Sequence, residues 1–196
     1  RGSDGGSEEA KGIGYQNAYS LYRVLELLDK NKHIRTISPE GHEDSTDIED
    51  LTIRYLKGGE EVVQVKKRET EAGEPGNWDP SEIKPILRKL LEVFETRRTV
   101  KVLRFVTQGG AHSQINHIRD ACNRLRSRRP KDTDDKALGD LCGLIGADRD
   151  TAREFMKSLH IETTRGNEES FASIVKGILM TDFGVKPRAI RVAYND

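Results

Sequence analysis

Apolar residues recur along the chain with two periods, and each period predicts a different kind of element. Over residues 15–28 they fall on one helical stripe, so we expect a first helix there. Residues 51–55 alternate apolar and polar positions as a half-buried strand does, and residues 62–66 follow after Gly58 and Gly59. Because glycine tolerates the positive φ of tight turns, this spacing predicts a β-hairpin.

The second half of the chain is dominated by the helical period. A short β-branched run at residues 100–106 predicts a buried strand, and Pro80-Ser81-Glu82 is a typical helix start. We expect helices over residues 80–94, 113–127, 135–144, 150–159 and 168–183. The order of helix, hairpin, helix, strand and then helices predicts an α/β core with a helical C-terminal part.

Length and composition narrow the class of protein. A chain of 196 residues favours one domain: a linker or disordered segment at 1–10, a core at 11–110 and a helical part at 111–196. The 33 basic and 33 acidic residues cancel, which argues against a generally basic binder. Two cysteines without ligand spacing argue against a disulfide framework and a zinc ribbon. With no signal or bilayer-length apolar run, we expect a cytoplasmic protein without a membrane partner.

One face of the predicted hairpin carries unusual side chains. Residues two apart in a strand point to the same side, so Gln64 and Lys66 share a face, while Val63 and Val65 lie on the face that we expect to pack on the core. Asp50 stands at the start of the partner strand. A turn at residues 58–59 brings the outer ends of both strands together, so we predict that Asp50 meets the end carrying Gln64 and Lys66.

This combination suits the hydrolysis of phosphodiester bonds. Mg²⁺ prefers oxygen ligands, and we expect three: the Asp50 carboxylate, the Gln64 side-chain oxygen and the Val65 backbone carbonyl, with Mn²⁺ as an alternative cation. Lys66 would lie beside the attacking water, either helping to deprotonate it or stabilising the transition state as a cation. The sequence leaves both roles open.

These residues resemble a known nuclease signature. An Asp, a hairpin and then Gln64-Val65-Lys66 resemble the PD-(D/E)xK pattern, in the glutamine variant found in Mrr-type restriction nucleases. The flanking motifs resemble the dsDNA endonuclease domains of prokaryotic anti-phage effectors, well over residues 12–110 and weakly beyond: Gly14-Tyr15-Gln16, Glu40-Gly41, residues 62–66 and Phe105-Val106-Thr107.

The resemblance implies a fold and a function. We expect a restriction-endonuclease-like core, with a mixed β-sheet flanked by helices, and a Mg²⁺-dependent endonuclease that cuts double-stranded DNA. The chain contains no evident recognition helix or zinc finger, so we expect little sequence specificity. The resemblance further implies a sensor region outside this chain, of the SAVED or STAND NTPase kind, and a homo-oligomer when active.

Several assignments stay open at this stage. Asp47 could replace Asp50 as the main cation ligand, with Asp44 a weaker candidate, and Glu40 could add a carboxylate. Gln16 either points at the site or caps local structure. Trp78 either inserts into a DNA groove or anchors its loop to the core, which we favour.

Candidate DNA contacts and rival functions also stay open. Lys67 and Arg68 adjoin the site, while Arg124 and Arg128 belong to a basic cluster that could hold the duplex beside it or form a solvated helix end. The functional alternatives are a nuclease for RNA or single strands and a catalytically silent module for DNA binding or oligomerisation.

Overall fold

The computed structural model describes residues 5–30, 33–39, 50–67, 76–163 and 168–184. The chain divides into two compact units, one formed by Arg1–Ile34 with Gly166–Asp196 and the other by Arg35–Arg165. The boundary predicted at residue 110 stays a prediction.

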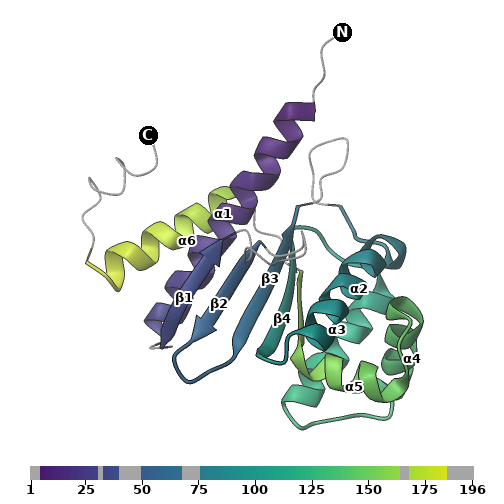
Figure 1. Ribbon diagram of the computed structural model, residues 1–196. Coiled ribbons are helices and arrows are strands. Elements are labelled where there is room, and N and C mark those ends of the chain that lie inside the picture. Colours follow the sequence, from purple (N-terminus) through teal and green to yellow (C-terminus); the bar gives the residue numbers. More distant parts are fainter. Residues whose placement is uncertain (1–4, 31–32, 40–49, 68–75, 164–167, 185–196) are drawn as a thin grey trace. The chain divides into compact units, whose positions relative to one another are not determined.

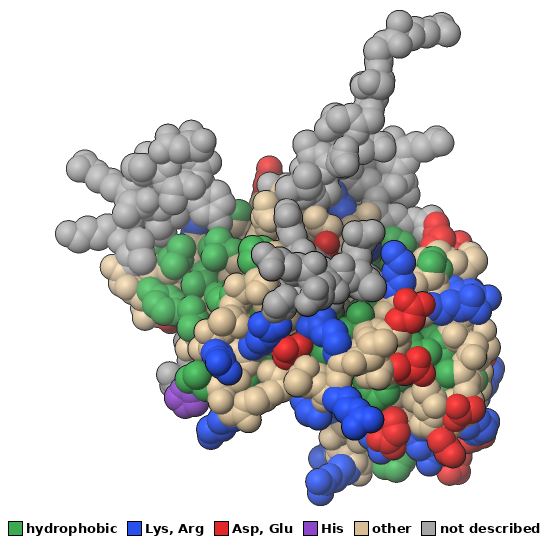
Figure 2. Space-filling model, viewed as in Figure 1, with side chains coloured by type: hydrophobic (Ala, Val, Ile, Leu, Met, Phe, Trp, Pro, Cys, Tyr) green, Lys and Arg blue, Asp and Glu red, His purple; other side chains and the backbone are tan. Residues whose placement is uncertain are grey.

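The first unit is built on two helices, α1 (Gly5–Asp29) and α6 (Glu168–Thr181) (Figure 1). α1 begins at Gly5, so it includes a segment for which the sequence favoured disorder. The tyrosine stripe of α1 contacts one phenylalanine of α6: the ring centroids of Tyr15, Tyr19 and Tyr22 lie 5.6, 5.5 and 5.5 Å from that of Phe171. These tyrosines therefore serve packing between the two helices. Hydrophobic side chains also remain visible over α6 (Figure 2).

A five-stranded mixed sheet forms the centre of the second unit, in the order β1-β2-β3-β4-β5 (Figure 1). β2 pairs with β3 antiparallel, whereas β3, β4 and β5 are parallel neighbours. The strands are β1 (Ile34–Pro39), β2 (Leu51–Tyr55), β3 (Glu60–Lys66), β4 (Val100–Thr107) and β5 (Leu159–Thr163). The mixed sheet predicted for the core is confirmed.

The hairpin of β2 and β3 forms as the sequence predicted. Gly58 and Gly59 adopt φ of 84° and 91° in its turn, a conformation that side chains with a β-carbon rarely take. The pairing runs from Arg54 opposite Glu60 to Leu51 opposite Val63. This register places the residue before Leu51 next to the residue after Val63, which is the basis of the candidate site.

Four helices build the apolar core on one face of this sheet: α2 (Pro80–Thr96), α3 (Ser113–Arg126), α4 (Asp134–Ile145) and α5 (Arg149–Ser158). α2 begins as predicted, with Pro80 in its first turn and the Glu82 carboxylate accepting a hydrogen bond from the Asp79 backbone N–H at 2.9 Å. Val62, Leu103 and several residues of these helices are fully buried together.

Two strands were missed by the sequence reasoning, β1 and β5. β5 lies within the part expected to be wholly helical, directly after α5. Its five residues alternate buried and half-buried positions, a signal too short to separate from the end of the preceding helix. The C-terminal part is therefore helical with one added strand, which extends the parallel section of the sheet.

A buried ion pair lies on the sheet face opposite the helices. The Arg104 guanidinium on β4 donates to Glu61 on β3 at 2.9 Å and to Glu162 on β5. The side chains of Arg104 and Glu61 are 8% and 1% exposed. Tyr55 donates from its hydroxyl to the other Glu61 oxygen at 2.8 Å. This network connects four neighbouring strands, and its central pair of charges is buried.

We expect Arg104→Met to lower the free energy of unfolding by about 3–5 kcal/mol, because it removes the cation that offsets the buried Glu61 carboxylate. Urea denaturation followed by circular dichroism measures the change. The matched control is Arg149→Met, since Arg149 pairs with Asp135 at side-chain exposures of 53% and 69%, where the expected change is under about 1 kcal/mol. Equal losses in both variants would contradict a structural role for the buried network.

Candidate active site

Asp50 meets β3 where the hairpin opens, as the sequence predicted. Its backbone N–H donates to the Val63 carbonyl at 3.1 Å, which continues the β2–β3 ladder by one bond. Its carboxylate Oδ2 accepts hydrogen bonds from the Val65 backbone N–H at 2.6 Å and from the Gln64 side-chain Nε2. The carboxylate is thus fixed against β3 by two donors.

Gln64 contributes an acceptor that no group within the described residues satisfies. The residue is 1% exposed, and its side-chain Oε1 is buried without a hydrogen-bond partner. A buried polar atom left in this state costs about 1–3 kcal/mol and calls for a specific explanation. A cation site provides this kind of oxygen. It has no hydrogen-bond partner of its own, and it belongs to an amide whose nitrogen contacts a carboxylate.

The face that carries Gln64 is also the face covered by the helices. Gln64 pairs in register with Phe105, and Val62 with Leu103, and the last three belong to the apolar core under α2–α5. The prediction that the opposite face, with Val63, would pack on the core was therefore incomplete. Both faces of β3 are buried, as is usual for a strand with a parallel neighbour, and the polar groups lie at the edge of the core.

Lys66 ends β3 on the same face as Gln64. Its register partner on β4 is Thr107, and its side chain is half-buried. Within the described residues, the Lys66 ammonium has no ion pair or hydrogen bond. A lysine at a strand end whose ammonium has no partner in the described part of the chain is suited to contact a bound anion such as a phosphate.

The donor set fits a hard cation such as Mg²⁺. In an extended strand the N–H and C=O of one residue point to the same side, so the Val65 carbonyl is directed toward the Asp50 side of β3. The carboxylate of Asp50, the open Oε1 of Gln64 and this carbonyl are all oxygen ligands. Among the described residues no cluster of three acidic, histidine or cysteine side chains could hold a metal, so this set depends on its amide and carbonyl oxygens.

The structure does not place the other predicted site residues at this site. Asp47, Asp44 and Glu40 fall outside the described residues, so the choice between Asp47 and Asp50 rests on the contacts of Asp50 alone. Gln16 lies in α1 of the first unit, where it is half-buried, and its direction toward the site stays a prediction.

The basic cluster after α3 does not lie beside this site. α3 starts shortly after the end of β4 and runs back along the sheet for 14 residues, about 21 Å. At its far end Arg126 donates to the backbone carbonyl of Leu159, the first residue of β5, which pairs with Leu103 toward the start of β4. In a parallel sheet the strand starts lie at the end away from the strand ends, so Arg126 lies away from Lys66, and the role of the cluster in holding DNA stays a prediction.

Within that cluster, Arg124 already has a carboxylate partner. Its Nε donates to Asp134 at 2.8 Å. Burial acts to raise the pKa of Asp134, but the hydrogen bonds from Arg124 and the Lys131 backbone leave it below its usual value. Arg128 is exposed with φ of 55°. DNA contact by Arg124 and Arg128 stays a prediction, as it does for Lys67 and for Arg68, which falls outside the described residues.

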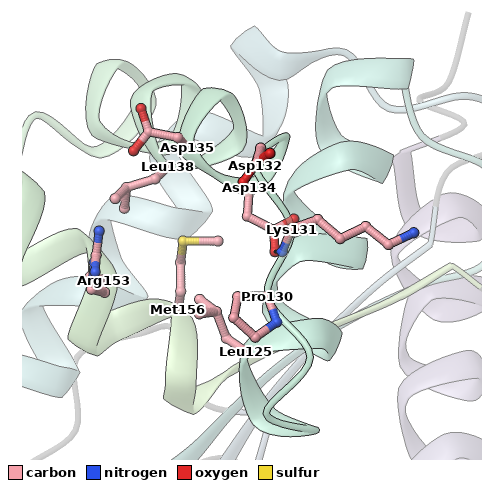
Figure 3. Close-up of a pocket in the computed structure, with 9 residues that line it drawn as sticks. All are labelled: Leu125, Pro130, Lys131, Asp132, Asp134, Asp135, Leu138, Arg153 and Met156. Atoms are coloured by element: carbon pink, nitrogen blue, oxygen red, sulfur yellow. Dashed lines mark hydrogen bonds between the residues drawn. The ribbon is translucent and has the colours of Figure 1, made fainter.

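A pocket opens between α3, α4 and α5, at the same far end (Figure 3). Apolar Leu125, Leu138 and Met156 line it, together with charged side chains from the α3–α4 loop, from the start of α4 and from α5. It contains none of the predicted catalytic residues. Basic and acidic side chains alternate over this helical face (Figure 2), so it carries no field of a single sign.

Trp78 anchors its loop, as we favoured. Its indole Nε1 donates to the Thr107 hydroxyl, its backbone bridges to Ala111, and its ring meets Phe105 edge-on with centroids 5.8 Å apart.

Gln108, the residue after Thr107, was missed by the sequence reasoning, which treated it only as part of the break after the strand. In the structure Gln108 is 3% exposed and has a buried Oε1 without a partner, which a lone glutamine in a glycine-rich segment does not reveal.

Among the described residues, no helix combines the length and the apolar character needed to cross a membrane.

Comparison with known proteins gives a consistent picture. A family described as "Cap4, dsDNA endonuclease domain" matches residues 4–176. No curated protein matches the chain.

Three similar solved structures are Cap4 SAVED/CARF-domain containing receptors. The Acinetobacter baumannii protein is 18% identical with the cyclic trinucleotide 2'3'3'-cAAA bound (TM-score 0.59, 89% of this chain, 36% of that one). Without that ligand the identity is 17% (TM-score 0.61, 92% and 39%). The Moraxella osloensis protein is 12% identical (TM-score 0.58, 89% and 38%). At these identities the likeness concerns the fold, and the chain spans less than two fifths of each receptor.

Proposed function

Because the chain belongs to the family of the Cap4 dsDNA endonuclease domain, we propose that it is a metal-dependent endonuclease acting on double-stranded DNA with little sequence specificity. We further propose that it is the effector part of a prokaryotic anti-phage protein whose sensor region lies outside this chain. One observation supports the site above all: Asp50 is fixed against β3 beside a glutamine whose buried Oε1 has no partner.

Each residue of the site has a distinct task in this proposal. Asp50, Gln64 and the Val65 carbonyl would hold Mg²⁺, or Mn²⁺ in its place. Mg²⁺ bound there would supply charge that orients a water and neutralises the phosphate. Hydrolysis joins a water oxygen to phosphorus and breaks one phosphorus–oxygen ester bond of the DNA strand, and the leaving sugar oxygen takes up a proton from solvent. The water must therefore lose a proton and the phosphate must gain stabilisation.

Lys66 stands where it can serve either need. It ends the strand that carries Gln64, two residues further along the same face, so its ammonium reaches the region in front of the amide oxygen. There it contacts the non-bridging phosphate oxygens as a cation or takes a proton from the water as a base. Both roles require the half-buried side chain to remain unpaired until DNA arrives.

The experiment is degradation of a supercoiled plasmid by the full chain, with Mg²⁺, with Mn²⁺, and with excess chelator. We expect nicked, linear and then smeared DNA with either cation and intact plasmid with the chelator. A smear indicates cleavage without sequence preference, whereas discrete bands would contradict that part. A panel of linear duplex, single-stranded DNA and RNA decides the substrate, since preferential loss of single strands or RNA would favour the rival nuclease.

Two outcomes would replace the proposal. Cleavage that persists in excess chelator would show that the reaction does not depend on a metal ion. No cleavage at any protein concentration, together with retained duplex binding, would favour a silent nuclease-fold module. Cutting both strands needs two sites, so we propose that the active form is a homo-oligomer, and linearisation should then rise more steeply than in proportion to protein concentration.

A further inference from the structure

Three parallel strands end in one row that begins at the candidate site. Lys66, the last residue of β3, pairs in register with Thr107, the last residue of β4. Thr107 in turn pairs with Thr163, the last residue of β5. Neighbouring strands lie about 4.8 Å apart, so the row spans about 10 Å from Lys66 to Thr163. Open α/β sheets commonly bind ligands outside this end of their parallel strands.

The side chains of this row lie on the sheet face that the helices cover. Residues two apart in a strand share a face, so Thr163 lies on the face of Ile161 and Leu159, which both belong to the apolar core under the helices. Residues paired in register on neighbouring strands also share a face, which places Lys66 on the same side as Thr163. A group that reaches Thr163 from these helices therefore lies on the Lys66 side of the sheet.

Arg119 on α3 reaches this row. Its Nη1 donates to the Thr163 hydroxyl at 2.9 Å, which joins the second turn of α3 to the end of β5. Helical side chains tilt toward the start of their helix, and α3 starts shortly after β4 ends. The guanidinium is therefore directed to the end of the sheet that carries the candidate site.

The Arg119 guanidinium keeps donors for a further ligand. Its Nε and Nη2 contact the Asp120 Oδ1 at 3.1 and 3.0 Å, and its Nη1 contacts Thr163. Arginine has five N–H groups, so within the described residues one N–H on Nη1 and one on Nη2 remain without an acceptor. The Asp120 side chain is 45% exposed, and water and salt screen an ion pair at that exposure, so the carboxylate offsets the Arg119 charge only in part. The Arg119 side chain is itself 28% exposed, so a ligand can reach it.

Of the arginines in α3, a helix described over its whole length, Arg119 alone is directed to the end of the sheet that carries the site. Arg124 hydrogen-bonds to Asp134, whose side chain is only 9% exposed. Arg126 donates to the Leu159 carbonyl at the start of β5. These two guanidinium groups already serve the structure, whereas Arg119 combines a fixed position at the row of strand ends with donors that no described residue uses.

We propose that Arg119 is a DNA-binding residue of the nuclease site, which contacts a backbone phosphate close to the one that Lys66 meets. Arginine suits this task because its planar N–H groups match phosphate oxygens. Each DNA strand carries one phosphate per about 3.4 Å of helix axis, so a row of about 10 Å matches two phosphates of one strand within about three nucleotides. The Thr163 hydroxyl holds the guanidinium in place. This inference rests on the proposed function, because Lys66 marks the phosphate only if the chain is a nuclease.

The test compares Arg119→Gln with Arg98→Gln in binding to a labelled DNA duplex, measured by fluorescence anisotropy in excess chelator over a range of salt concentrations. Arg98 is exposed just before β4, so the control removes the same charge at the opposite end of the sheet. For Arg119→Gln we expect Kd at low salt to rise about 5- to 20-fold. The slope of log Kd against log salt should fall by about 1, which corresponds to one lost phosphate contact. For Arg98→Gln we expect a Kd within about 2-fold of wild type and an unchanged slope.

Thr163→Val separates the position of the guanidinium from its charge. The variant removes the hydroxyl that Arg119 contacts and keeps the arginine. We expect Kd to rise about 2- to 5-fold with an unchanged salt slope, because the contact persists but the guanidinium must be ordered when DNA binds. A Kd equal to that of the wild type would overturn the role given to Thr163.

Cleavage and stability complete the test of Arg119→Gln. Plasmid cleavage should slow about as much as binding weakens when protein is limiting, and the loss should shrink at saturating protein. An unchanged salt slope would overturn the inference, and so would equal rises in Kd for Arg119→Gln and Arg98→Gln. A lowered urea midpoint with wild-type Kd would leave Arg119 a structural role only. If wild type cleaves but Arg119→Gln binds like wild type, only the inference falls. If wild type binds duplex and never cuts it, the proposed function falls and the salt slope still decides the phosphate contact.

Discussion

Lys66→Ala is expected to reduce plasmid cleavage by about 10²- to 10⁴-fold while leaving the fold intact. The side chain is half-buried at the end of β3 and makes no ion pair or hydrogen bond within the described residues, so its removal costs little stability. It removes the cation or base nearest to the proposed position of the phosphate. Single-turnover cleavage of the supercoiled plasmid, with protein in excess, measures the loss.

The matched control for this variant is Lys57→Ala. Lys57 lies exposed in the turn between β2 and β3, at the opposite end of the same strand pair, so it carries the same charge without proximity to the site. We expect its cleavage rate to remain within about 3-fold of wild type, the effect of a distant surface charge on DNA association. Equal rates for wild type and Lys66→Ala would show that the site lies elsewhere.

Asp50→Asn is expected to lower cleavage by about 10²- to 10³-fold and to raise the Mg²⁺ concentration needed for half-maximal rate. Asparagine keeps an oxygen that can accept the hydrogen bond from the Val65 backbone N–H, which Asp50 accepts at 2.6 Å, so the local backbone conformation should persist. The substitution removes the negative charge of Asp50, the only carboxylate that the described residues contribute to this set of cation ligands. A Mg²⁺ titration of the cleavage rate separates the loss of affinity from the loss of rate at saturation.

Asp132→Asn provides the control for charge alone, because Asp132 is exposed in the loop between α3 and α4 at the far end of the sheet. Its Mg²⁺ titration should overlay that of the wild type. If Asp50→Asn also overlays the wild type, then the cation ligand is another carboxylate, and Asp47 or Glu40 becomes the residue to replace. That result would correct the ligand set without removing the nuclease.

The hairpin and its chemistry could be predicted because they depend on short-range geometry. Alternation over residues 51–55 and 62–66 and the glycines between them determine the register, and the register places Asp50 next to Gln64. Among the predicted site residues, those in this hairpin could therefore be brought together by counting along the sequence. Gln16 could not, because its place depends on how a separate unit is positioned.

The failures concern pairings between segments distant in sequence. No strand was expected at β5, in a part of the chain described as helical, and its identity as a strand depends on β4, which gives it a parallel partner. The sequence left open whether the basic cluster lies beside the site, and α3 carries its Arg126 to the start of β5. Neither fact is encoded in a local period of apolar residues, because both follow from the direction in which a helix returns along a sheet.

Sequence alone thus determined the residue types of the site and their common strand, since side chains two apart in an extended chain must share a face. The tertiary structure decided which face the helices cover, and therefore that Gln64 is buried with an open oxygen. It also brought Thr107 beside Lys66, through a parallel pairing of β3 with a strand that begins more than thirty residues later in the chain. Long-range pairing arises from the packing of the whole sheet against its helices, and no segment contains that information by itself.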